Sequence, residues 1–207
     1  MLPRMRKGEV VSKKHDLAEA RRAEIEVWYR GSGMDVAVPV PNVFNCQLKA
    51  WANLGKAIFF IPTSSVLTYE RFMTAVGQGN HWTVKDEAAR AKIGWEPVET
   101  GRWFLLEVSK DSPRLKTSRK DLLGQIRLPS LEEYAVAYWI HQALTGVRLN
   151  PSTWCWLRAY FGLGALLAND NAGQLHVSWF GAEDLASSFE VGGGRAVEPV
   201  ESLPLAA

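Results

Sequence analysis

The carboxyl-terminal quarter of the chain most limits what the protein can fold into. Residues 154–197 are rich in Gly, Trp, Ala and Ser, and contain short alternating runs without a helical period. In the run QLHVSWF two sets of residues alternate: Leu175, Val177 and Trp179 on one side, and His176, Ser178 and Phe180 on the other. Successive side chains of a β-strand point to opposite faces of its sheet. The pattern predicts tight β-hairpins, whose last strand has one core face and one face of mixed chemistry.

The part of the chain before Asn150 has helical and strand patterns. It predicts helices at 16–30, 67–77 and 130–145, and strands at 57–62 and 101–109. The clearest helix follows Ser130, which forms a capping-box pattern with Glu133, and Gly146 is suited to end it. Helices and strands followed by hairpins predict an α+β domain over 16–197. We expect a flexible basic arm at 1–15 and a flexible tail at 198–207.

Composition limits the classes of partner. The formal net charge of +2 is too small to indicate nucleic acid or an acidic membrane surface as a partner. No apolar run approaches the roughly 20 residues that span a bilayer. The basic start MLPRMRKGEVVSKKHD is not followed by the apolar segment of a secretory signal. The sequence therefore predicts a cytoplasmic protein, and leaves display on a surface or virion open.

Residues suited to catalysis or metal binding form no known motif. Cys46 and Cys155 are too few for a disulfide framework or a four-cysteine zinc site, so we expect free thiols, with one disulfide as the alternative. The four histidines lack metal-ligand spacing, and serine-nucleophile motifs are absent. Only a Cys155–His141 pair remains as a candidate for chemistry. We predict no cofactor, no metal and no catalytic residue.

Gly192–Arg195 has the glycine content of a phosphate-binding loop. It lacks the GK[ST] ending, and no helix is predicted after it. We therefore expect a tight turn that needs positive φ or a close backbone approach.

Several residues of 154–195 have no evident packing or turn role. They are Arg158, Ala159, Tyr160, Phe161, Leu163, His176, Ser178, Phe180, Gly181, Ala182, Ser187, Ser188 and Phe189. Large rings among Ser, Gly and Ala are typical of protein-binding surfaces, where rigid rings supply contact area and small residues supply adaptable polar contacts. The alternative is that the rings fill a small β core.

The runs LPSLEEYAVAYWIHQALTG, TWCWLRAYFG, LLANDNAGQLHVSW and GGGRAV, in this order, resemble the variable proteins of diversity-generating retroelements. The resemblance covers about residues 57–197 and is strongest from 126 onward. It implies a C-type lectin-like fold and a non-enzymatic ligand-binding function. In this family a reverse transcriptase copies a template repeat with errors at adenines, mainly within asparagine codons. Such changes reach many residue types but never Trp, Met, Gln, Glu or Lys.

This codon rule is compatible with the residue set defined above. Every member of the set is reachable from an asparagine codon, whereas the scaffold residues Trp154, Trp156, Gln174 and Trp179 are not. Glu183 and Glu190 are also unreachable, which makes them either scaffold or products of other template codons. The resemblance implies a variable ligand-binding region at about 154–195, with an unknown macromolecular ligand, expected to be a protein. Its expected anchors are Tyr160, Phe161, Phe180 and Phe189, with polar contacts from Arg158, His176, Ser178, Ser187 and Ser188.

Two alternatives remain open. One is an enzyme on the same fold, similar to formylglycine-generating enzymes, although the chain is short for that group and lacks its paired cysteines. The other is a tail or structural display protein of a virus. Neither the residues nor the resemblance predicts an oligomeric state.

Overall fold

The computed structural model describes residues 7–77, 98–161, 164–180 and 192–202, with the backbone alone at 7–14, 69–70, 159–161 and 179–180. The helices in these ranges are α1 (Lys7–Gly31), α2 (Asn45–Asn53), α3 (Tyr69–Ala75), α5 (Arg119–Leu123) and α6 (Leu131–Thr145). The strands are β1 (Lys56–Ile61), β2 (Arg102–Glu107), β3 (Trp154–Phe161), β4 (Gly164–Asn171), β5 (Gln174–Phe180), β6 (Gly192–Gly193) and β7 (Val197–Val200). The predicted α+β class is therefore confirmed.

The first sheet has the strand order β1-β2-β7, with antiparallel pairing throughout. Residues 58–61 of β1 are all buried, because apolar groups cover both faces of this sheet. Side chains of α1 lie against β1: the Tyr29 hydroxyl donates to the Phe60 carbonyl at 2.7 Å, and Arg21 Nε donates to the Ile58 carbonyl at 3.1 Å. These bonds satisfy backbone oxygens on an edge strand.

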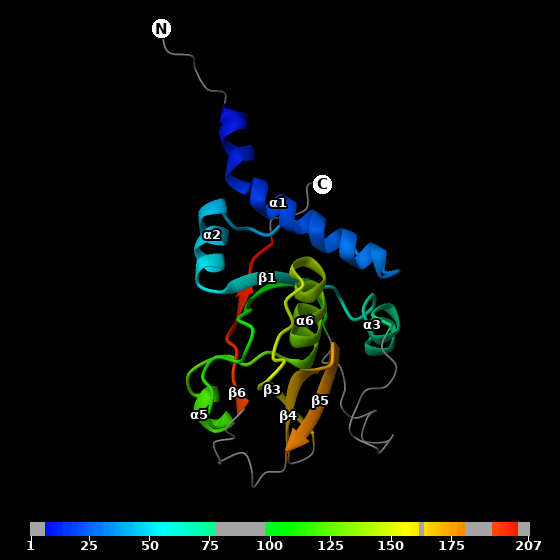
Figure 1. The fold of residues 1–207 in the computed structure, drawn as a ribbon. Coiled ribbons are helices and arrows are strands. Elements are labelled where there is room, and N and C mark those ends of the chain that lie inside the picture. The colour runs from blue at the N-terminus through cyan, green and yellow to red at the C-terminus, as the bar shows by residue number, and fades with distance from the viewer. Residues whose placement is uncertain (1–6, 78–97, 162–163, 181–191, 203–207) are drawn as a thin grey trace.

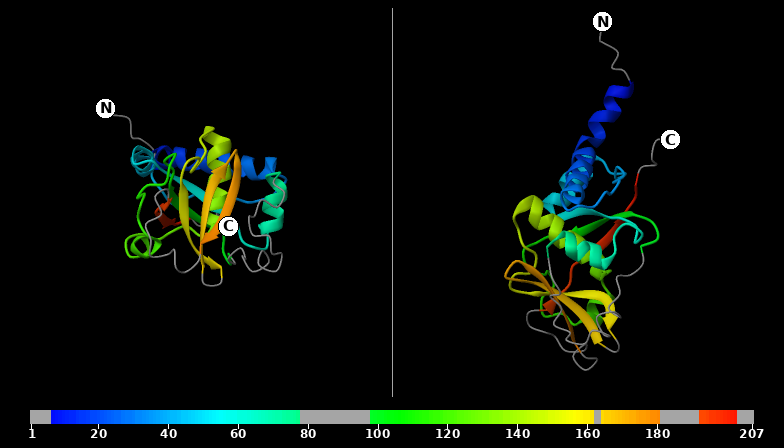
Figure 2. Two further views of the ribbon diagram at one scale, coloured as in Figure 1. Left: turned by 60° about the horizontal axis from the view of Figure 1, so that its bottom comes forward. Right: turned by 90° about the vertical axis from the view of Figure 1, so that its right-hand side faces the viewer.

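The second sheet has the order β5-β4-β3-β6, in which only β6 runs parallel to its neighbour. Helix α6 packs between the two sheets. The second sheet and α1 lie at opposite ends of the molecule (Figures 1 and 2). The predicted capping box at Ser130 and Glu133 is confirmed, and Gly146 ends α6 with φ of 73°. Tyr138 joins α6 to β4 by donating to Asp170 at 2.7 Å.

Both ends of the predicted domain need correction. Helix α1 begins at Lys7, so the arm predicted for 1–15 is helical from that residue, and Asp16 is an interior position instead of the N-cap. The residues between Lys7 and Asp16 include Glu9, Lys13 and Lys14, which are good helix formers. The flexible tail predicted from 198 is wrong for 198–200, because β7 pairs with β2. Pro199 is tolerated there because β7 is an edge strand.

Other predicted elements differ mainly in their bounds. The predicted strands at 57–62 and 101–109 correspond to β1 and β2. The helix predicted at 67–77 is shorter, because Thr68 caps α3 and its last residue is Ala75. Helices α2 and α5 were not predicted. None of the helices within the described ranges is long and apolar enough to cross a membrane.

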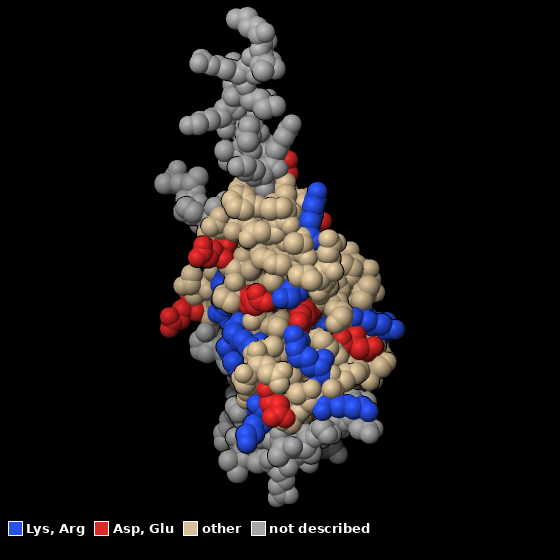
Figure 3. All heavy atoms as spheres, turned by 90° about the vertical axis from the view of Figure 1, so that its left-hand side faces the viewer, with Lys and Arg blue, Asp and Glu red and all other residues tan. Residues whose placement is uncertain are grey.

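On the face of the molecule that includes α2 and α5, basic and acidic side chains are interspersed (Figure 3). Ion pairs within the described residues include Lys56 with Glu198 at 2.7 Å and Arg114 with Glu107 at 2.5 Å. The distribution over this face agrees with the small net charge of the chain.

Candidate functional site

Strand β5 has the two faces that its sequence predicts. Leu175 and Val177 are each 4% exposed and belong to the main core. His176 and Ser178, which alternate with them, are only partly buried. One face of β5 therefore contributes to folding, and the opposite face reaches solvent at these two positions.

The register of the second sheet aligns other predicted site residues with this open face. Ser178 pairs with Leu167, which also pairs with Trp156, so these residues form one row across the sheet. In the next row Ala165 pairs with both Tyr160 and Phe180. Directly paired residues share a face of the sheet. The positions of Tyr160, His176, Ser178 and Phe180 therefore lie on the same side.

This side of the sheet is only partly open to solvent. Trp156 and Leu167 are fully buried on it and form a second small core with Leu122 of α5 and Leu128. Helix α5 thus covers the β3 and β4 part of the face. The β5 part remains partly open, because His176 and Ser178 lie on the edge strand of the sheet.

Trp154 lies within the candidate surface, although the sequence pattern predicts only a scaffold role for it. Its ring contacts the His176 ring at 5.3 Å between centroids, across the central strand β4. His176 Nδ1 also forms a hydrogen bond with Asn169 Oδ1 at 3.2 Å. Both rings are partly exposed. The position of Trp154 two residues before Trp156 was the available signal, because it places both indoles on one face.

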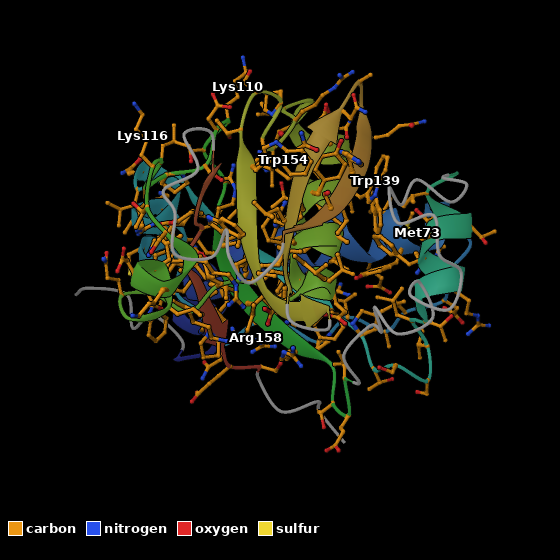
Figure 4. All side chains as sticks on the ribbon, turned by 90° about the horizontal axis from the view of Figure 1, so that it is seen from below. Met73, Lys110, Lys116, Trp139, Trp154 and Arg158 are labelled. Carbon is orange, nitrogen blue, oxygen red and sulfur yellow. The ribbon has the colours of Figure 1, made fainter. Side chains whose placement is uncertain are left out.

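Arg158 lies where β3 departs from regular pairing. The β3–β4 register shifts between Trp156 and Tyr160. The Arg158 N–H donates to the Pro129 carbonyl at 2.8 Å, and its own carbonyl accepts from Arg119 at 2.5 Å. Trp154 and Arg158 lie toward opposite ends of β3 when the sheet is seen from below (Figure 4). The Arg158 side chain is partly buried.

The remaining predicted site residues fall outside what the structure describes in full. Ala159, Tyr160, Phe161 and Phe180 are described by their backbone within β3 and β5. Leu163, Gly181, Ala182, Ser187, Ser188 and Phe189 lie outside the described residues.

The glycine-rich segment is held by close backbone contact. A Cβ added to Gly193 would lie 2.7 Å from the Pro113 carbonyl, and one added to Gly194 would lie 2.9 Å from Leu122. This confirms the predicted close approach, whereas neither Gly193 nor Gly194 has positive φ. Gly192 and Gly193 form β6 instead of a turn, and pair with Trp154 and Cys155.

Arg195, which follows these glycines, is completely buried. Its Nε donates to Asn150 Oδ1 at 2.9 Å and its Nη1 donates to the Glu107 carbonyl at 2.9 Å. Asn150 is itself buried and also accepts from the Tyr134 hydroxyl at 2.9 Å. This buried polar cluster fixes the segment that precedes β3 against the segment that follows β6.

The candidate catalytic residues Cys155 and His141 are both buried. Both cysteines are free, as expected, with Cys46 exposed on α2 and Cys155 buried in β3. Burial raises the pKa of Cys155 to about 11 and lowers the pKa of His141 to about 4, so both groups are uncharged at neutral pH. Within the described ranges, no hydrogen bond joins the two and no group of acidic, His and Cys residues is arranged to hold a metal ion.

Comparison of the chain with family models, curated proteins and solved structures finds no match.

Proposed function

We propose that the protein is a non-enzymatic ligand-binding protein, a variable protein of a diversity-generating retroelement with a C-type lectin-like fold. Its binding surface is the partly open face of β3–β5 and the segments that follow these strands. The targets are macromolecules, most suitably proteins, and vary between copies of the gene. One observation carries the proposal: along β5, His176 and Ser178 lie on the partly open face, while Leu175 and Val177 lie in the core.

This alternation supports diversification because of its energetic consequence. Substitutions at surface positions usually change the free energy of unfolding by less than about 0.5 kcal/mol. Truncation of a buried aliphatic side chain costs several times more. A strand with this arrangement accepts new residues on one face without losing the fold.

The residue types agree with the codon rule of the proposed family. His and Ser, at 176 and 178, can arise from asparagine codons by changes at adenines, whereas Trp cannot. Trp156, which is fully buried, is of the type that the mechanism never produces. Trp156 of the second core is thus of a residue type that the proposed diversification does not introduce.

The arrangement of the elements supports the fold assignment. The helices and the first sheet mostly precede α6, the hairpins follow it, and the glycine-rich segment closes the second sheet through β6. The alternative of an oxidising enzyme with paired cysteines gains no support, because Cys46 is exposed on α2 and Cys155 is buried with a raised pKa.

The test is deep sequencing of this locus across the population that carries it. We expect substitutions at 158–163, 176, 178 and 180–189, with Trp156, Trp179 and Gly192–Arg195 unchanged. Leu175 and Val177 provide the matched control on the same strand, because they share the template but lie in the core. Equal substitution frequencies at Val177 and Ser178, or uniformly low variation over the region, would contradict the proposal.

A further inference from the structure

We infer that Arg119 is a positioning residue of the binding surface, because its guanidinium donates to backbone carbonyls of β3 and so fixes the path of this strand beneath the surface. The inference depends on the proposed function, since it explains how the side chains from 158 onward can be replaced without loss of the strand.

Strand β3 contains a bulge, at which its pairing with β4 is interrupted. Between Trp156 and Tyr160 β3 advances four residues, whereas β4 advances only two between the paired residues Leu167 and Ala165. The extra residues of a bulge lose their ladder hydrogen bonds and bend the strand. Backbone groups of Leu157 and Arg158 therefore need partners from outside the sheet.

Arg119 supplies these partners from the first position of α5. Its Nε donates to the Leu157 carbonyl at 3.1 Å, and its Nη2 donates to the Arg158 carbonyl at 2.5 Å. The planar guanidinium suits such a double contact, because its donors are held in a rigid fork. Arg119 is 2% exposed and its bond to the Leu157 carbonyl is buried, which strengthens that bond.

A third hydrogen bond at the bulge also joins backbone groups, since the Arg158 N–H donates to the Pro129 carbonyl at 2.8 Å. None of these three bonds involves the side chain of Arg158. A different side chain at 158 thus leaves the bonds in place. The contact between Trp154 and His176 is different, because it depends on both side chains.

The position of Arg119 is set by residues outside the proposed variable region. Ser118 caps α5, with its hydroxyl oxygen accepting from the Asp121 N–H at 3.1 Å. Leu122, one turn further along α5, packs into the second core. The helix, the cap and the fork therefore stay constant while the surface changes.

The experiment measures tolerance to diversification in three backgrounds: the natural chain, Arg119→Lys and Arg119→Met. In each background, positions 158–161 are randomised and the chains are displayed on yeast. The measured quantity is the fraction of library members that resists protease. A control library randomises exposed positions of α1, namely Ala23, Glu24, Val27 and Arg30.

We expect both libraries to survive in the natural background. In Arg119→Met the survival of the 158–161 library should fall about fivefold further than that of the α1 library. A merely structural arginine would lower overall stability and reduce both libraries equally, and that result would overturn the inference. Arg119→Lys retains the charge but lacks the fork, so we expect an intermediate fall; it also serves if Arg119→Met does not fold.

The natural background separates the two ideas. Failure of the 158–161 library in that background contradicts the proposed function itself. Survival there, together with equal losses in both libraries of the Arg119 variants, contradicts only the role of Arg119.

Discussion

Replacement of Asn150 by Ala tests whether the buried polar cluster around Arg195 stabilises the protein. Asn150 Oδ1 accepts from the Tyr134 hydroxyl and from Arg195 Nε, each at 2.9 Å. Its Nδ2 donates to Ser112 Oγ at 2.6 Å and to Thr153 Oγ1 at 2.8 Å. Asn150 also has φ of 60°, a conformation that Asn adopts more readily than Ala.

The expected loss follows from these contacts. A hydrogen bond between neutral groups contributes about 1 kcal/mol, and one to a charged group about 2 kcal/mol, so the four bonds amount to about 5 kcal/mol. The unfavourable φ adds about 1 kcal/mol for Ala. We therefore expect Asn150→Ala to lower the free energy of unfolding by at least about 4 kcal/mol, a large part of the 5–15 kcal/mol of a typical domain.

The measurement is equilibrium unfolding in urea, followed by tryptophan fluorescence and far-UV circular dichroism. Asn169→Ala is the matched control, since the side chain of partly buried Asn169 forms a hydrogen bond with His176, and the loss of this bond should cost at most about 1 kcal/mol. If Asn150→Ala does not fold, Tyr134→Phe provides the measurement instead. This variant removes the hydrogen bond from the Tyr134 hydroxyl to Asn150 and should cost about 1 kcal/mol. A loss below about 2 kcal/mol for Asn150→Ala would refute the reasoning.

Three further predictions concern the core face of β5 and two buried titratable groups. Val177→Ala should lower the free energy of unfolding by about 2 kcal/mol, because two methyl groups are lost and a cavity remains. Ser178→Ala should change it by less than about 0.5 kcal/mol. Equal losses for the two variants in urea unfolding would contradict the two-faced strand. In the native protein at pH 8, a thiol reagent should modify exposed Cys46 rapidly and Cys155 only after denaturation, because burial raises the pKa of Cys155 to about 11; rapid modification of both would be inconsistent with this. Burial lowers the pKa of His141 to about 4, below its unfolded value near 6.5, so the unfolded chain binds the extra proton and stability should fall by up to about 3 kcal/mol as the pH drops through this window. The variant His141→Gln should flatten this dependence between pH 7 and pH 5, and an unchanged slope would show that other groups cause it.

The elements that the sequence predicted well have local signals. Helix α6 has its cap at Ser130, its reciprocal bond to Glu133 and its left-handed residue at Gly146, all within the segment itself. Helix α2 was missed because Phe44 provides no side-chain cap for it and none of its residues is buried. Helix α5 is only five residues long, too short for a periodic pattern. Strand β7 has no signal of its own, because it depends on pairing with β2, which is distant in sequence.

The candidate site shows the same division. Alternation within 174–180 predicted that Leu175 and Val177 are buried and that His176 and Ser178 are not. The burial of Trp156 and Leu167 on that second face depends on Leu122 of α5, a contact that arises only in the folded chain. The pattern of a single strand describes its two faces, but it does not reveal what packs against each.

The contacts of Asn150 and Arg195 have a consequence for the length of the segment between them. The Asn150 N–H and Arg195 Nη2 both donate to the Lys110 carbonyl, at 2.7 Å and 3.4 Å, so the two ends of this segment meet at one backbone carbonyl. Closing a flexible loop costs only about 0.6 kcal/mol more for each doubling of its length. Insertions and deletions between the strands should therefore change the free energy of unfolding little, as long as both ends keep their contacts. Variants of this chain should thus tolerate a change in the length of the segment between Asn150 and Arg195 better than a change at either of these two residues.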